Sequence, residues 1–211
     1  METPEEIDAR FDARAPHYDE SAMHRELAAA VADFVDLGGV TELLDVGTGT
    51  GLLLRALPAG PARLTGVDRS AGMLAVARGA LPGARFAQAD AARLPFDDDA
   101  FDVVACVTAL HLFADAEAAL REWRRVLRPD GRIVTASFAA PEGADAASAR
   151  PHGHTPPERH RPFGSAEALE RFGAAAGLEL ARLSEWRFPG TGAEEPRTEE
   201  HCLIAEFAPA G

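Results

Sequence analysis

The stretch that decides the fold is "LLDVGTGTGLLL", residues 43–54. An apolar run ends at Asp45 and Val46, and glycines then occupy the alternate positions 47, 49 and 51. This pattern is typical of a buried strand that runs through a tight loop into a helix. The loop is not the dinucleotide-binding G-x-G-x-x-G, because residue 52 is leucine, and it lacks the Lys-Ser/Thr pair of a phosphate-binding P-loop. Glycines packed this closely let the backbone pass under a ligand, and the helix start behind them favours an anionic group such as a carboxylate.

Working outward from this loop, strand-like and helix-like segments alternate from about residue 42 to residue 138. Strands are expected at residues 41–47, 62–68, 84–90, 101–110 and 132–138, with helices at 51–57, 70–81 and 115–131. Ser70 and Asp115 are the expected N-caps of the last two helices, and Pro129 to Gly131 the expected end of the last. Continuous apolar strands separated by single helices predict an α/β fold: a doubly wound, mostly parallel sheet with helices on both faces.

The flanking segments complete a single predicted domain. Residues 1–40 read as a helical cap that ends at Gly38-Gly39, and residues 41–138 as a ligand-binding core. Residues 139–164, rich in Pro, Gly and His, form a long connection on the substrate side. Residues 165–211 hold a helix capped by Ser165 and two strands, at 178–188 and 199–209. The link between these strands is too short for a crossover helix, so they are expected to pair antiparallel.

Three aspartates recur at the ends of the first three expected strands. Asp45, Asp68 and Asp90 lie one strand-helix unit apart. In an open parallel sheet the carboxyl ends of the strands share one edge, where ligands bind. Asp68 suits ribose hydroxyls, Asp90 suits the exocyclic amine of adenine, and the glycine loop suits a small charged tail. Helix capping would explain any one of these aspartates, but three in step beside the loop predict a nucleoside site.

Composition limits the partners. The chain has 211 residues and a formal net charge of −13, which argues against a nucleic-acid partner. Its two cysteines, Cys106 and Cys202, lie in apolar runs and are expected to be reduced core thiols. Without a signal peptide or an apolar run of membrane-spanning length, we expect a cytoplasmic protein with no membrane partner, a monomer or a homodimer.

These features together resemble the class I S-adenosylmethionine-dependent methyltransferases of the small-molecule type. The resemblance is carried by "LLDVGTGTG" (43–51), "TGVDRSAGML" (65–74), "AQADAARLPFDDDAFDVV" (87–104), "VTALHLF" (107–113) and "EWRRVLRPDGRIVTASF" (122–138). "FDARAPHYDE" (11–20) is similar to their N-terminal segment. The resemblance implies a Rossmann-like, seven-stranded sheet with the last strand antiparallel. It also implies S-adenosyl-L-methionine as cofactor, S-adenosyl-L-homocysteine as product and methyl transfer to a small-molecule acceptor.

Site residues follow from the resemblance position by position. Gly47, Thr48, Gly49 and Gly51 belong to the glycine loop beside the methionine part of the cofactor, and Asp45 organises that loop. Asp68 would hold the ribose. Arg69 and Met73 would flank the adenine, and Asp90 and Ala91 would contact its edge. Thr108 would lie beside the sulfonium and Tyr18 would cover the cofactor.

Methyl transfer from a sulfonium is mainly a problem of alignment, so the sequence carries few marks of the chemistry. His111, just after the fourth strand, is the candidate general base, and a pocket-lining or structural role is the alternative. A metal site from His152, His154 and His160 lacks Cys or acidic partners at ligand spacing beyond Glu158, so no metal is predicted. Two other functions stay open: an S-adenosylmethionine-binding regulatory protein without transferase activity, and a nicotinamide-dependent oxidoreductase, which Leu52 disfavours.

Overall fold

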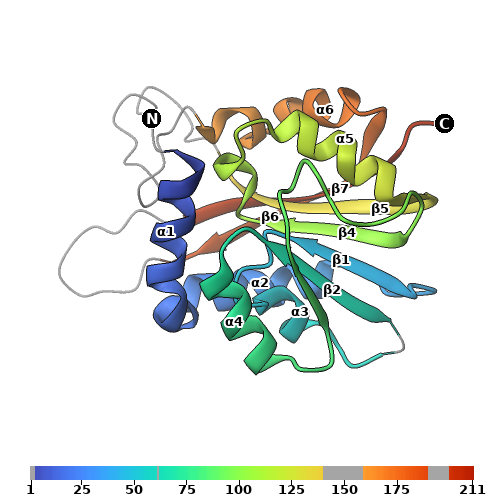
Figure 1. Ribbon diagram of the computed structural model, residues 1–211. Coiled ribbons are helices and arrows are strands. Elements are labelled where there is room, and N and C mark those ends of the chain that lie inside the picture. The colour runs from blue at the N-terminus through green and yellow to red at the C-terminus, as the bar shows by residue number, and fades with distance from the viewer. Residues whose placement is uncertain (1–2, 61, 140–158, 190–199) are drawn as a thin grey trace, which may run out of the picture.

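A computed structural model describes residues 3–60, 62–139, 159–189 and 200–211 of the chain (Figure 1). Its centre is a seven-stranded sheet of order β3-β2-β1-β4-β5-β7-β6. The strands are β1 (Glu42–Val46), β2 (Arg63–Asp68), β3 (Arg85–Gln88), β4 (Phe101–Val107), β5 (Leu127–Phe138), β6 (Leu178–Phe188) and β7 (Glu200–Pro209). The first five strands pair in parallel, and β7 lies antiparallel between β5 and β6. The predicted Rossmann-like fold with an antiparallel last strand is confirmed.

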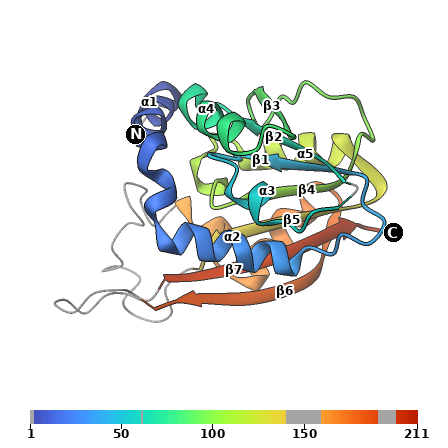
Figure 2. The same cartoon turned by 90° about the horizontal axis from the view of Figure 1, so that it is seen from below.

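Helices cover both faces of the sheet. The helices are α1 (Pro4–Arg14), η1 (Ala15–Glu20), α2 (Ala22–Phe34), α3 (Leu52–Ala56), α4 (Ala71–Ala80), η2 (Leu110–Leu112), α5 (Ala116–Val126), η5 (Arg161–Phe163) and α6 (Ala166–Ala174). Helices α5 and α6 lie on one face, and α2 and α3 on the other (Figures 1 and 2). The predicted caps Ser70, Asp115 and Ser165 each accept a backbone N–H from the first turn of α4, α5 or α6. These caps fix where the helices at the strand ends begin.

Several element boundaries differ from the sequence-based expectation. Helix α5 ends at Val126, not at Pro129–Gly131, because the fully buried Leu127 already pairs with Phe101 as the start of β5. The N-terminal helical region ends earlier than Gly38, at Phe34. Strand β4 ends at Val107, where Thr108 turns the chain with a φ of 50°. Thr108 thereby lies at the rim of the sheet and not inside a strand.

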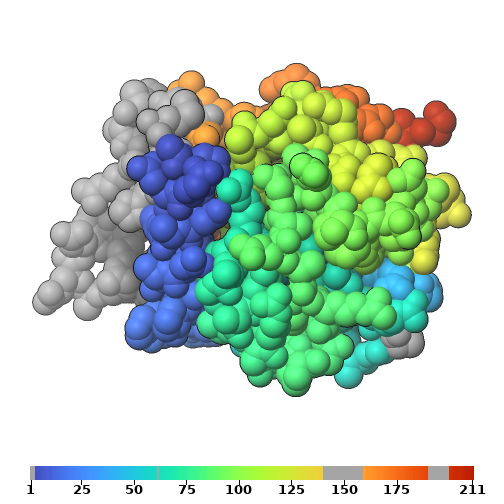
Figure 3. All heavy atoms as spheres, viewed as in Figure 1, coloured from blue at the N-terminus to red at the C-terminus, as the bar shows by residue number. Residues whose placement is uncertain are grey.

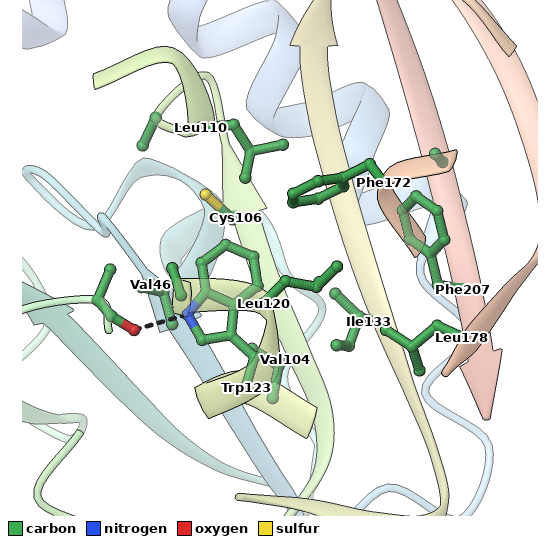
Figure 4. Close-up of a cluster of buried hydrophobic side chains, with 14 of the residues drawn as sticks. Val46, Val104, Cys106, Leu110, Leu120, Trp123, Ile133, Phe172, Leu178 and Phe207 are labelled. Atoms are coloured by element: carbon green, nitrogen blue, oxygen red, sulfur yellow. Dashed lines mark hydrogen bonds between the residues drawn. The ribbon is translucent and has the colours of Figure 1, made fainter. Parts of the chain in front are cut away.

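The larger of two apolar clusters packs α5 and α6 against the sheet. Its largest fully buried side chain is Trp123 of α5, which lies among residues from β1, β4 and β5 (Figure 4). The indole Nε1 donates a 3.0 Å hydrogen bond to the carbonyl oxygen of Ala91, in the loop after β3. The second cluster joins α2 and α3 to the opposite face. Trp123 therefore connects the core by a hydrogen bond to a loop at the carboxyl ends of the parallel strands.

Candidate functional site

A cavity of about 260 Å³ lies at the carboxyl ends of the parallel strands. Loops after β1, β2, β3 and β4 form its floor and sides, and α1 and η1 form its outer wall. Figure 3 shows α1 on the surface beside α4 at this end of the molecule. The lining residues are Pro4, Ile7, Asp8, Phe11, Tyr18, Val46, Gly47, Gly49, Val67, Asp68, Arg69, Ser70, Met73, Ala89, Asp90, Ala91, Ala92, Val107, Thr108, Ala109, Leu112, Phe113, Ala114, Asp115 and Ala119.

The glycine loop needs its glycines for backbone conformation as well as for space. Gly47, Gly49 and Gly51 have φ values of 71°, 53° and 79°, in the left-handed region that disfavours other residues. A Cβ on Gly47 would also come within 2.7 Å of the Cβ of Ala109. Gly51 occupies the N-cap position of α3. The loop therefore presents bare backbone to the cavity at Gly47 and Gly49.

Asp68 joins the ends of β1 and β2. Its Oδ2 accepts the Gly49 N–H at 2.8 Å, and its Oδ1 accepts the Ser70 N–H at 2.9 Å. Burial raises the pKa of Asp68, and the backbone hydrogen bonds oppose that rise. Each carboxylate oxygen has a second lone pair, so Asp68 can still accept hydroxyl groups from a ligand in the cavity.

Arg69 and Asp90 form the more open side of the cavity. Arg69 Nη1 lies 3.3 Å from Asp90 Oδ2, and Asp90 Oδ1 accepts the Ala92 N–H at 2.9 Å. Arg69 also pairs with Asp8 of α1, with Nη2 to Oδ2 at 2.9 Å. Asp90 is therefore held by the loop that follows it, with Ala91 beside it in the cavity wall.

Asp45 lies under the glycine loop and is 2% exposed. Its Oδ2 accepts a 2.7 Å hydrogen bond from Thr48 Oγ1, as expected of a loop organiser, whereas Oδ1 is buried with no hydrogen-bond partner among the described residues. Burial raises the pKa of Asp45 to about 7. Beside it is a second cavity of about 40 Å³, which shares Gly47, Gly49, Tyr18 and Thr108 with the larger one. The two cavities therefore adjoin, and the smaller one can take a small donor group facing Asp45.

Tyr18 forms the wall between the two cavities. Its ring stacks on His24 of α2 with a centroid distance of 4.6 Å and an interplanar angle of 6°. Its hydroxyl hydrogen-bonds the Thr108 side chain, and burial raises the pKa of Tyr18 to about 12. Burial lowers the pKa of His24 to about 4. Both rings are therefore neutral at pH 7.

The structure brings most of the sequence-predicted residues to one place. The larger cavity is lined by nine of them: Tyr18, Gly47, Gly49, Asp68, Arg69, Met73, Asp90, Ala91 and Thr108. Asp45 and Thr48 line the smaller one, while Gly51 supports the loop from behind, as the cap of α3. A helical cap at residues 1–40 with Tyr18 over the ligand was expected, and the structure adds side chains of α1 to the wall of the cavity. The capping box of Thr3 and Glu6, with Pro4 at the first helical position, is the signal that marks this helix.

His111 is not among the side chains that line either cavity within the described part of the chain. Its ring lies next to the buried His160, with centroids 4.3 Å apart, and both rings meet Phe138 edge-on. Arg159 Nη1 donates to the His111 carbonyl oxygen at 3.2 Å. His111 thus lies one residue from the cavity-lining Leu112, at the ends of β4 and β5. His152 and His154, considered above as metal ligands, lie outside the described residues.

Comparison with known proteins agrees with this arrangement. A family model described as a methyltransferase domain matches residues 44–135. A curated demethylmenaquinone methyltransferase from Streptomyces griseus is 35% identical over 144 residues, which are 65% of this chain and 63% of the relative. The chain therefore spans less than two thirds of that relative's length.

Solved structures share the fold. A SAM-dependent methyltransferase from Aquifex aeolicus superposes with a TM-score of 0.58 at 18% identity, covering 79% of this chain and 81% of the other. The [4+2]-cyclase SpnF superposes with a TM-score of 0.66 at 22% identity, covering 89% of this chain and 82% of the other. Among the described helices, none is long and apolar enough to span a membrane. The match over residues 44–135 identifies a methyltransferase domain in this chain, and its fold is shared with solved S-adenosylmethionine-dependent methyltransferases.

Proposed function

We propose that this protein transfers a methyl group from S-adenosyl-L-methionine to a small-molecule acceptor. The observation that carries the proposal is the cavity at the strand ends, where bare backbone at Gly47 and Gly49 faces two carboxylates, Asp68 and Asp90. This spacing of groups suits an adenosyl ligand with a charged tail. The loop has no phosphate-binding motif, so a ligand with a pyrophosphate is not favoured.

The residues that line the cavity suit the proposed cofactor. Asp68 would accept hydrogen bonds from the ribose hydroxyls, and Asp90 with the Ala91 backbone would hold the edge of the adenine. Met73 and Arg69 would flank the base. The buried Oδ1 of Asp45 and the small cavity beside it suit the α-ammonium group, which supplies donors and positive charge. Thr108 and Tyr18 lie at the junction of the two cavities, where the sulfonium would sit.

When bound, the cofactor supplies an electrophilic methyl group on a good leaving group. The chain itself would bind the cofactor and the acceptor, orient them for the transfer and exclude water from the site. Tyr18 is suited to that role, since its pKa of about 12 would keep the phenol neutral next to a bound cofactor. If the acceptor is a hydroxyl or an activated carbon, its proton must leave. His111 is the proposed proton acceptor, because it precedes Leu112, which lines the cavity.

The acceptor is proposed to be a small aromatic molecule of the quinone type. Support comes from the names of the curated relatives and from the aromatic side chains Phe11, Tyr18 and Phe113, which line the larger cavity. A site built from rings favours a flat apolar acceptor. The SpnF match is a reminder that this fold also carries other reactions, so the acceptor has to be tested and not assumed.

The test is label transfer from methyl-labelled S-adenosylmethionine. The full chain is incubated with reduced naphthoquinones and with a panel of phenols and amines, and the extracted products are counted. Transfer that is lost in Asp68→Ala supports the proposal. Tight cofactor binding with no transfer to any acceptor would favour a cofactor-sensing regulatory protein. Binding of a nicotinamide nucleotide without S-adenosylmethionine binding would contradict both.

A further inference from the structure

Helix α1 buries little apolar surface against the rest of the protein. Helix α1 has no buried residues, and in η1 the buried residue is Ala15. The apolar side chains Pro4, Ile7 and Phe11 face the larger cavity and not the hydrophobic core. An element with so little buried apolar surface belongs to the least stable part of a fold. A nucleoside in the cavity would therefore bury the apolar side of α1.

Polar contacts attach this segment, and they come from three aspartates. Asp8 pairs with Arg69 after β2. Asp12 Oδ1 accepts the Ser70 hydroxyl at 2.5 Å and the Gly72 N–H at 2.8 Å. Asp19 accepts the Thr50 hydroxyl at 2.5 Å and pairs with Arg55 of α3 at 2.5 Å. Each carboxylate contacts a different element beside the cavity: the loop after β2, the start of α4, and the glycine loop with α3.

The contacts of Asp12 bring α1 close to the start of α4. Ser70 caps α4 by accepting the Met73 N–H and at the same time donates its hydroxyl to Asp12. The carboxylate lies at the positive end of the helix dipole, which favours its charge. A Cβ on Gly72 would come within 3.0 Å of the Asp12 Cα, so any other residue at position 72 would push α1 away by a few tenths of an ångström. The Ser70 and Gly72 hydrogen bonds lower the pKa of Asp12, so the latch stays charged at neutral pH.

We propose that residues 4–20 form a movable roof over the cofactor cavity, latched by Asp8, Asp12 and Asp19, and that Asp12 is the positioning residue that sets how fast the cofactor enters and leaves. This inference rests on the proposed function for the identity of the ligand. The roof forms the outer wall of the cavity, and its Asp8 holds Arg69 at the more open side, so opening of the roof widens the entrance for a nucleoside. Breaking one polar latch then raises the opening rate without touching the floor of the site.

The test compares Asp12→Ala with Glu5→Ala, a matched control that removes an exposed carboxylate from the same helix. Stopped-flow fluorescence measures dissociation of S-adenosylhomocysteine from the full chain. Asp12→Ala is expected to dissociate the ligand at least about 5-fold faster, as for the loss of hydrogen bonds to a charged group, while Glu5→Ala matches the wild type. Asp12→Asn, which keeps an acceptor oxygen and loses the charge, should fall between them. Thermal melting of each variant shows that the core is folded.

Hydrogen exchange measured without ligand separates this proposal from the proposed function. Backbone amides of residues 4–20 should exchange faster in Asp12→Ala than in wild type or Glu5→Ala, while β1 and β4 are unchanged. S-adenosylhomocysteine should slow exchange of the same residues in wild type. Failure of wild type to bind S-adenosylhomocysteine would refute the assigned ligand. Unchanged exchange of residues 4–20 in Asp12→Ala, or an unchanged dissociation rate in a chain that does bind, would refute the latch.

Discussion

The carboxylate of Asp68 accepts the backbone N–H of Gly49 at 2.8 Å, across the gap between the ends of β2 and β1. One side chain thus orders the glycine loop and lines the cavity that the loop faces. Loop geometry and ligand contact are coupled in this residue, and substitution of Asp68 should affect both.

Asp68→Ala should weaken S-adenosylhomocysteine binding by about 1–3 kcal/mol, the range for losing hydrogen bonds to a charged group. Isothermal titration calorimetry measures the change. Asp97→Ala, in the exposed turn before β4, is the matched control and should bind normally. Equal affinity of Asp68→Ala and wild type would show that Asp68 does not hold the ribose.

Gly47→Ala should destabilise the fold by about 1–3 kcal/mol, because φ is 71° and the new Cβ would overlap that of Ala109. Gly79→Ala is the contrasting control. Position 79 lies within α4, and a methyl group added there would meet no atom within 4 Å among the described residues, so alanine should stabilise by about 0.5–1 kcal/mol. Urea unfolding measures both. A stable Gly47→Ala protein would mean that the loop relaxes easily.

The raised pKa of Asp45 predicts that the stability of the protein depends on pH. Its pKa is about 7 in the folded state and about 3.9 in the unfolded chain, so the folded state binds more protons between these values. The free energy of unfolding should therefore fall as pH rises from about 4 to about 7, by at most roughly 1.4 kcal/mol per unit.

Asp45→Asn should remove this contribution and make the protein more stable than wild type above pH 7, since the amide can still accept from Thr48. Denaturant melts at a series of pH values give the slope. Parallel slopes for the two proteins would show that Asp45 is already ionised in the folded state.

Trp123→Phe should lower the free energy of unfolding by about 1–3 kcal/mol, because it removes the donor to the Ala91 carbonyl and leaves space in the core. Since Ala91 lines the cavity, cofactor affinity should fall as well. Trp186→Phe, at a half-buried position on β6, is the comparison and should change stability by less than about 1 kcal/mol. If Trp123→Phe left cofactor affinity unchanged, the packing of Trp123 in the core would not influence the cavity wall at Ala91.

The sheet could be predicted because local pattern and tertiary structure agree there. The strands around Asp45 and Val104 are mainly apolar runs, and Ser70 and Asp115 mark helix starts by a rule that acts over three residues. The end of α5 was misplaced because Leu127 pairs with Phe101, a contact that the local sequence does not carry.

The sequence predicts a helical cap with Tyr18 over the cofactor, but the contacts that hold α1 in place could not be predicted, for the same reason. Asp8 meets Arg69 across 61 residues, and Asp12 meets Ser70 across 58. An aspartate on a helix reads as a solvated charge until its distant partner is known. Likewise, the packing of the His111 ring on His160 depends on a segment 49 residues away, which the residues around His111 do not indicate.

The most direct test of the central claim is a crystal structure of the full chain with S-adenosylhomocysteine. We predict the ribose on Asp68, the adenine edge at Asp90 and Ala91, and the amino-acid end at the glycine loop above Asp45. A nucleoside bound elsewhere, or side chains filling the space between Asp68 and Asp90 with no ligand at saturating concentration, would contradict this prediction.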